Sequence, residues 1–137
     1  MPDRSYTDVI KRLRLANLRP TRQRIGLGKL LFTGEERHFT ADQLHVEADR
    51  AGLSVSLATV YNTLHQFCET GLLLEVVVDP SRSYFDTNTE RHHHFFNPEK
   101  GELSDIPADG IDIEGLPAPP PGTRIGRVDI VVRIHND

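Results

Sequence analysis

Apolar residues recur at helical spacing in four stretches before Gly71. In SYTDVIKRLRLANLRP, positions 6, 9, 10 and 13 share one helix face, and Asn17 and Pro20 are suited to end the helix. Thr21 can cap a second helix through TRQRIGLGKLLF, where each of two glycines costs about 1 kcal/mol relative to alanine. The pattern therefore predicts two helices before Thr33.

Two further helices follow, each with its own start and stop signals. In TADQLHVEADRAG, Thr40 and Gln43 form a capping box, and Gly52 ends the helix. In SLATVYNTLHQFCETG, Ser56 is the cap, positions 57, 60, 64 and 67 make an apolar stripe, and Gly71 ends the helix.

The spacing changes from helical to extended after Gly71. LLLEVVV and SYFD read as two strands, and DPSR between them reads as a turn. Helices followed by a β-hairpin are typical of a winged helix-turn-helix, with residues 56–69 as its recognition helix. Residues 1–86 are therefore predicted to form a winged-helix DNA-binding domain.

Residues 87–137 show extended rather than helical spacing of apolar residues and are predicted to form a second, β-rich domain. RHHHFF and GELSDI are two strands around the turn NPEKG, and RIGRVDIVVRIH is a final strand. The intervening IPADGIDIEGLPAPPPG holds four of the nine prolines in its last six residues and is predicted to be a loop. A unit this small buries little by itself, so we expect it to dimerise with a twin subunit. The fold class is α+β, with a winged helix-turn-helix followed by an abbreviated β-rich dimerisation domain.

Composition restricts the classes of protein that fit. Of 137 residues, 37% are hydrophobic and 26% charged, which suits a small globular chain. No apolar run approaches the roughly 20 residues that span a bilayer, and MPDRSYTDVI has no apolar signal core, so we expect a cytoplasmic protein with no membrane contact. The single cysteine, Cys68, excludes an internal disulfide and is interpreted as a small buried hydrophobe.

Charge is distributed unevenly along the chain. Residues 1–24 hold seven basic and two acidic side chains, whereas residues 79–137 hold six basic and eleven acidic ones. A basic N-terminal end favours contact with a polyanion, although a solvated helix face has the same appearance.

The predicted recognition helix presents polar residues beside its apolar stripe. Asparagine and glutamine can pair with adenine, hydroxyls contact phosphates or bases, and a tyrosine ring can contact a thymine methyl. Each residue alone reads as ordinary surface, but the four helices, the wing and the basic end together favour double-stranded DNA. The candidates are Ser56, Thr59, Tyr61, Asn62, Thr63 and Gln66.

Three consecutive histidines in RHHHFFNPEK are the main candidates for ligand chemistry. In a strand, His92 and His94 share a face about 7 Å apart, and His93 points away. An H-x-H pair can converge on a metal, and imidazoles can also be axial ligands of haem.

Four motifs together resemble the ferric uptake regulator family of bacterial DNA-binding repressors: LRPTRQR, HFTADQLH, SLATVYNTLHQFCETGLL and HHHFF, within residues 15–106. The absence of cysteines from HHHFFNPEKGELSDI resembles the iron response regulator branch. The resemblance implies a winged-helix homodimer in which Tyr61 reads bases and Arg19 and Arg24 lie at a minor groove or phosphates. Asn62 stands where the family usually has arginine.

The resemblance also implies a regulatory metal site at the hinge between the domains. Its nitrogen and oxygen ligands suit Fe(II), Mn(II) or Zn(II). Metal occupancy would then set the separation of two recognition helices, which must match a two-fold operator. The implied ligands are His38, Asp86, His92, His94 and Asp105.

Other family sites are altered in this chain. The iron response regulator branch implies haem binding at His92, His93 and His94, although the Cys-Pro pair of some members is absent. A second metal site beside His93 would draw on Asp112 and would meet a cation at Arg127. The Cys-x-x-Cys pairs of relatives have no counterpart, since Asn97 and Lys100 occupy the first. No structural zinc held by four cysteines is therefore expected, and apolar strand packing must hold the dimer.

The sequence thus predicts an iron-responsive transcription regulator that senses haem, a divalent metal or both. One alternative is a peroxide-sensing repressor of the same family, in which bound Fe(II) catalyses the oxidation of a histidine ligand by peroxide. Another is a small metalloenzyme, because an open nitrogen and oxygen site can activate water. No separate general base or substrate pocket is evident, so we predict that the chain is not an enzyme.

Haem binding has a direct spectroscopic test. Haem titration should shift the Soret band, and the shift should disappear in the His92→Ala/His93→Ala/His94→Ala variant, because the axial imidazoles are then gone. If the variant shows the same Soret shift as the unsubstituted protein, these histidines do not ligate haem.

Contact between the basic end and DNA is tested by salt dependence. Arg19→Ala should weaken DNA binding and reduce the slope of log K against log salt by about 1, because one fewer counterion is released. A slope equal to that of the unsubstituted protein would count against a phosphate or groove contact at Arg19.

Overall fold

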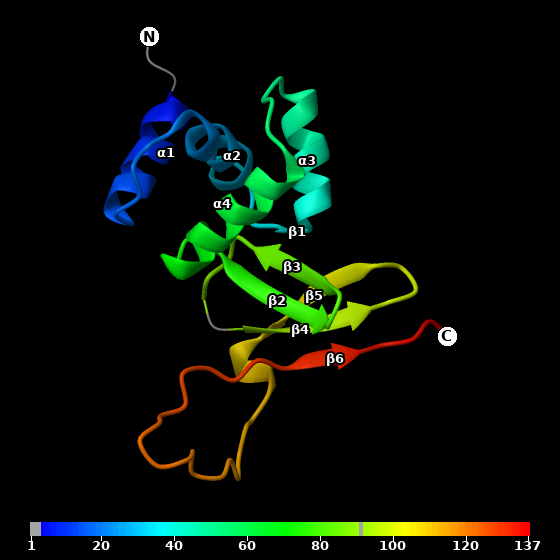
Figure 1. The fold of residues 1–137 in the computed structure, drawn as a ribbon. Helices are drawn as coiled ribbons and strands as arrows, with labels where there is room; N and C mark the ends of the chain where they lie inside the picture. Colours follow the sequence, from blue (N-terminus) through cyan, green and yellow to red (C-terminus); the bar gives the residue numbers. More distant parts are fainter. Residues whose placement is uncertain (1–3, 91) are drawn as a thin grey trace. The chain divides into compact units, whose positions relative to one another are not determined.

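The computed structural model describes residues 4–90 and 92–137, and the chain divides into two compact units between Thr89 and Glu90. This division follows the boundary expected after Asp86 by three residues. In the first unit the helices are α1 (Arg4–Leu15), α2 (Arg22–Phe32), α3 (Ala41–Arg50) and α4 (Leu57–Glu69), and the strands are β1 (His38–Phe39), β2 (Leu74–Asp79) and β3 (Arg82–Asp86) (Figure 1). The second unit contains β4 (His92–Asn97), β5 (Glu102–Pro107), the 3-10 turn η1 (Ala108–Gly110) and β6 (Val131–Arg133).

Local side-chain hydrogen bonds define the helix starts that the sequence predicts. The Thr21 hydroxyl accepts a backbone N–H of the first turn of α2 at 3.2 Å, and the Ser56 hydroxyl does the same for α4 at 3.1 Å. Thr40 and Gln43 form the reciprocal capping box of α3, at 3.2 and 2.9 Å. Asn17 has a φ of 61°, the left-handed conformation expected after α1. These predicted helix ends are confirmed.

The two glycines of α2 are explained by close packing. A Cβ atom on Gly28 would lie 2.7 Å from Cγ1 of Val9 in α1, and one on Gly26 would lie 2.6 Å from Cδ2 of Leu53. Glycine at these positions lets α2 approach its neighbours, so burial offsets the loss of helix propensity. The residues of the first unit's core with no exposed surface include Val9, Leu13, Leu27, Phe39, Leu44, Ala48, Val60, Leu64 and Phe67.

One predicted polar position of α4 is wrong. Thr63 is buried, with 5% of its surface exposed, instead of lying on the polar face. It falls at helical spacing between Val60 and Phe67 and beside Leu64, so the apolar stripe includes it. The DNA-facing set predicted for this helix therefore loses one member.

The sheet of the first unit contains a strand that the sequence pattern does not reveal. The strand order is β1-β3-β2, and β1 has only two residues. Antiparallel pairing sets His38 opposite Asp86 and Phe39 opposite Phe85. The two phenylalanine rings lie 5.8 Å apart and are buried, so β1 is held in register on one face by aromatic packing.

The sheet of the second unit has the order β5-β4-β6. The predicted hairpin of β4 and β5 is present, but the final strand is much shorter than the expected stretch of residues 124–135. It pairs with β4 in parallel, and His94 is opposite Val131. In this parallel register Asp129 lies opposite His92, where β4 begins. Residues before Asp129 therefore have no β4 residue with which to pair.

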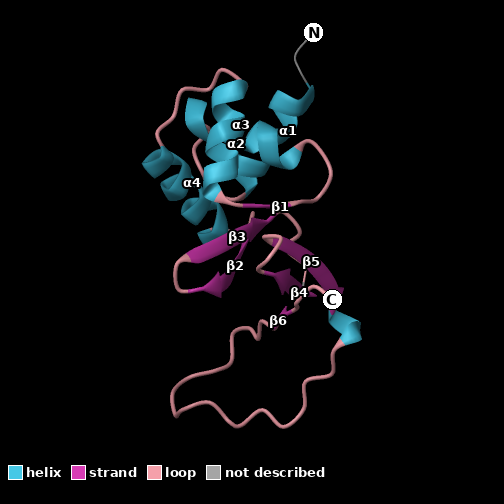
Figure 2. Cartoon of the chain, turned by 90° about the vertical axis from the view of Figure 1, so that its right-hand side faces the viewer, coloured by secondary structure: helices cyan, strands magenta, loops and turns pink. Residues whose placement is uncertain are grey.

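The proline-rich connection is a loop, as predicted. Residues 111–130, which follow the turn at Ala108–Gly110, contain no helix or strand. Figure 2 shows them as one long loop before β6. Within the described ranges 4–90 and 92–137, no helix has the length and apolar character needed to cross a membrane.

Candidate metal centre and DNA-contacting residues

The first unit places a histidine and a carboxylate side by side. Because β1 pairs with β3, His38 Nε2 lies 3.0 Å from Asp86 Oδ2. The other carboxylate oxygen of Asp86 accepts the backbone N–H of Asn88 at 2.9 Å. Asp86 is therefore oriented from both sides, and its Oδ2 points at the imidazole.

The second unit contains its own cluster of two histidines and one carboxylate. Strand alternation puts His92 and His94 on one face of β4, with ring centroids 4.5 Å apart. Asp105 of β5 is the register partner of His94, and its Oδ1 lies 3.3 Å from Nε2 of His92 and 3.5 Å from Nε2 of His94. The ligand atoms of these three residues all lie within 4.8 Å of one another.

A backbone contact orients the ring of His92 for ligand chemistry. Its Nδ1 lies 2.6 Å from the carbonyl oxygen of Glu90, and only a protonated Nδ1 can donate to that acceptor. In the neutral ring, Nε2 then carries a lone pair that faces Asp105. Such an outer hydrogen bond is typical of metal-ligating histidines, and two imidazoles with a carboxylate fit Fe(II), Mn(II) or Zn(II).

The side chain of His93 lies on the opposite face of β4 from His92 and His94. Its Nδ1 accepts the backbone N–H of Ile130 at 3.2 Å, and the backbone of His94 donates to the Ile130 carbonyl at 3.1 Å. The ring is 1% exposed. His93 thus fastens the segment that enters β6, so its haem-ligating role stays a prediction that requires this hydrogen bond to break.

Two of the other sequence positions considered for metal have side-chain partners of a structural kind. Nε of Arg127 donates to the carboxylate of Asp129 at 2.9 Å. Asn97, which stands at the first expected cysteine position, accepts the N–H groups of Glu99 and Lys100, both at 3.1 Å. Asn97 thereby organises the turn between β4 and β5.

An amide network at that turn was not predicted from the sequence. Nδ2 of Asn97 donates to Oδ1 of Asn136 at 2.8 Å, and Asn136 in turn donates to Glu99 Oε2 at 2.6 Å. Thirty-nine positions separate the two asparagines, so no local motif signals their contact. The network ties the end of the chain to the β4–β5 turn by hydrogen bonds.

The candidate DNA-contacting residues of α4 differ in how available they are. Tyr61 and Asn62 are exposed, and 39% of Tyr61 is accessible. The hydroxyls of Ser56 and Thr59 are 3.0 Å apart, and Ser56 also caps the helix. Exposed side chains on one helix turn therefore remain the best placed for base contacts.

Arg24 is held within the first unit in this structure. Its Nε and Nη2 donate to Oε1 of Gln66 at 3.2 and 3.0 Å, and its Nη1 donates to the carbonyl oxygen of Arg19 at 2.9 Å. These bonds join α2, α4 and the loop before α2. Arg19 itself is exposed.

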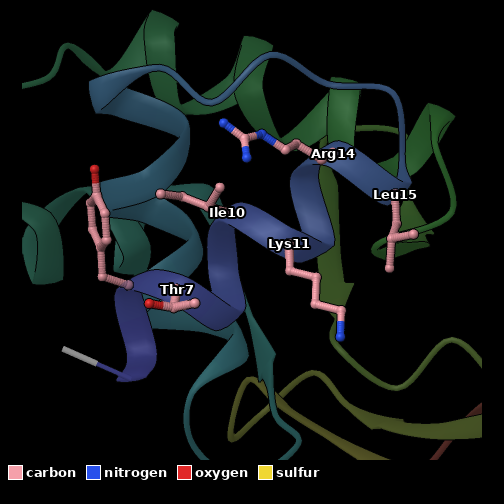
Figure 3. A pocket seen from close by; sticks show the side chains of 6 residues that line it. Thr7, Ile10, Lys11, Arg14 and Leu15 are labelled. Carbon is pink, nitrogen blue, oxygen red and sulfur yellow. The ribbon is translucent and has the colours of Figure 1, made fainter. Parts of the chain in front are cut away.

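An open groove follows the outer side of α1. Figure 3 shows Lys11 and Arg14 beside Ile10 and Leu15 along this helix. Two of the seven basic residues at the N-terminal end therefore flank an apolar surface. The groove contains none of the predicted DNA contacts or metal ligands.

Comparison with known proteins identifies the family. The ferric uptake regulator family matches residues 15–116. The chain belongs to the ferric uptake regulator family. The peroxide-responsive repressor PerR of Staphylococcus epidermidis is 32% identical over 104 residues, which cover 76% of this chain and 69% of that protein. PerR of Staphylococcus aureus is 33% identical over 97 residues, covering 71% of this chain and 65% of that protein.

Solved structures of the family share the fold. The ferric uptake regulator from Pseudomonas aeruginosa with manganese has a TM-score of 0.69 at 23% identity, covering 93% of this chain and 97% of that chain. The Vibrio cholerae ferric uptake regulator has a TM-score of 0.71 at 19% identity, covering 93% and 98%. The predicted α+β fold class and the family resemblance are confirmed. Members of this family are metal-responsive, DNA-binding transcription regulators, and not enzymes.

Proposed function

We propose that this chain is a sensor of a divalent metal, Fe(II), Mn(II) or Zn(II), that regulates transcription by binding double-stranded DNA as a homodimer. The observation that carries the proposal is the presence of a histidine–carboxylate pair in the first unit and a His-His-Asp cluster in the second. Both sets offer only nitrogen and oxygen ligands, which suit these metals.

The two ligand sets are proposed to form one site. A connection of only five residues, 87–91, joins Asp86 to His92 and so limits how far apart these two ligands can lie. A metal supplies a multivalent positive charge that can accept donors from both sets. Its five ligands would be His38, Asp86, His92, His94 and Asp105.

Metal binding at such a site would couple to DNA binding through geometry. His38 and Asp86 belong to the unit that carries α4, whereas His92, His94 and Asp105 belong to the other unit. Holding both sets together restricts the angles between the units and hence the spacing of two α4 helices in a dimer. Metal changes DNA affinity only by as much as it binds the DNA-competent arrangement better than the others.

The proposed DNA contacts follow from exposure. Tyr61 and Asn62 would meet base edges in the major groove, and Arg19 would meet a phosphate or the minor groove. Ser56 and Thr59 would contact the backbone beside the helix start. Arg24 would either keep its hydrogen bonds and hold the loop at Arg19 against α4, or release Gln66 and contact DNA with its guanidinium.

A dimer interface is proposed on one face of the second unit. Strand pairing aligns Phe95 of β4 with Val132 of β6, and Ile134 follows on the same face. These three apolar side chains are 36–38% exposed. Covering them with a second subunit would bury a surface that a lone unit leaves in water, and the operator would then have two-fold symmetry.

Metal titration of the purified chain tests the site. His92→Ala should weaken Mn(II) binding about tenfold or more and abolish metal-dependent DNA binding, because a ligand is lost. His135→Ala is the matched control, since this histidine is exposed and lies outside the cluster. Equal metal affinity in the His92→Ala variant and the unsubstituted protein would reject the proposed site.

Peroxide sensing is a second candidate, supported by the PerR relatives and by histidines that lie against carboxylates. After Fe(II) loading and peroxide treatment, mass spectrometry of proteolytic fragments should then find one added oxygen on His38 or His92. His135 should gain none. Fragments without added oxygen, in protein that still binds Fe(II), would leave metal sensing in place and exclude this mode.

A further inference from the structure

Thr87 makes three hydrogen bonds to a single residue fifty positions earlier in the chain. The backbone N–H of Arg37 donates to Thr87 Oγ1 at 2.8 Å. The backbone N–H of Thr87 donates to the Arg37 carbonyl at 3.1 Å, and the Thr87 hydroxyl donates to the same carbonyl at 3.4 Å. The threonine thus brackets both polar groups of the Arg37 backbone.

This contact lies directly beside the proposed metal ligands of the first unit. Arg37 precedes His38, and Thr87 follows Asp86, while His38 and Asp86 are themselves paired across β1 and β3. The Thr87–Arg37 contact therefore extends the ladder by one pair. A two-residue strand has few hydrogen bonds of its own, so this extra pair contributes much of what holds its register.

The side chain of Arg37 is fixed from another direction. Its Nη1 and Nη2 donate to the two carboxylate oxygens of Glu47 in α3 at 2.7 and 2.6 Å. That hydrogen bond lowers the pKa of the Glu47 carboxyl and raises the pKa of Arg37, so both partners stay charged. The guanidinium also lies 5.3 Å from the ring centroid of Phe39. Arg37 therefore has a fixed side chain, and its backbone depends on Thr87.

We propose that Thr87 is a positioning residue for metal binding: its hydroxyl holds β1 in the register that keeps His38 opposite Asp86. Thr87 does not touch the metal in this proposal. It keeps two ligands preorganised before the metal arrives, so less ordering is needed on binding. The inference rests on the proposed metal function of the His38–Asp86 pair.

The hydroxyl is the part of Thr87 on which the proposal depends. Thr87→Val keeps the shape of the side chain and the backbone bond to Arg37, but it leaves the Arg37 N–H without its 2.8 Å acceptor. Thr87→Ser keeps the hydroxyl and loses only a methyl group. The pair of variants thus separates the hydrogen bond from side-chain volume.

The experiment is a Co(II) titration of the full chain followed by visible absorption, which reports both affinity and ligand geometry. Thr87→Val should raise the Kd for Co(II) about tenfold and alter the d–d bands. Tenfold is the lower end of the loss in metal affinity when a hydrogen-bonding residue behind the ligands is replaced. Thr87→Ser should restore both to the values of the unsubstituted protein.

Thr70→Val is the matched control for a stability effect alone. Thr70 also donates its hydroxyl to a carbonyl, that of Gln66 at 3.0 Å, but it is the C-cap residue of α4, and its hydroxyl and backbone N–H bond to carbonyls of that helix. This variant should lower the unfolding temperature and leave the Kd and spectrum unchanged. A Thr87→Val variant that behaves in the same way would overturn the positioning role.

A metal-free measurement separates the inference from the proposed function. In the metal-free protein, hydrogen exchange of the Arg37 amide should be faster in Thr87→Val than in Thr87→Ser, because β1 loses its closing bond. Slow exchange in both variants would overturn the inference alone. If His38→Ala and the unsubstituted protein bind Co(II) equally, the proposed metal site fails, and the positioning role fails with it, whatever the exchange rates.

Discussion

The pairing of the two-residue strand β1 with β3 is the constraint on which the candidate site of the first unit depends. It brings His38 within 3.0 Å of Asp86, and nothing in the local sequence of either residue requires this contact. The aromatic pair Phe39 and Phe85 supports the same register from the core. The hydrophobic core and the ligand pair are therefore two consequences of one strand alignment.

In the second unit, successive side chains of β4 point to opposite faces of the strand and therefore make different contacts. His92 and His94 point at Asp105, whereas His93 accepts a hydrogen bond from the chain entering β6. Further along the same strand, Asn97 organises the turn that leads to β5. Three adjacent imidazoles thus do not make three equivalent ligands, because their neighbours across the sheet differ.

Features set by neighbouring residues are predicted well from the sequence. The caps at Thr21, Thr40 and Ser56, the β4–β5 hairpin and the proline loop all follow from short-range rules. The errors have a common origin in long-range packing and pairing. The residue type of Thr63 favours the polar face, but its position on α4 places it in the core. The length of the last strand depends on where its partner strand begins, which its own residues do not reveal.

By itself the sequence determined the helix ends, the class of fold, the alternation within HHH and, through its motifs, the family. These depend on backbone geometry and side-chain type over a few residues. Only the tertiary structure decided that Arg37 meets Thr87, that Arg24 meets Gln66 and that Asn97 meets Asn136. Those partners are 39 to 50 positions apart, and packing selects them from many chemically equal alternatives.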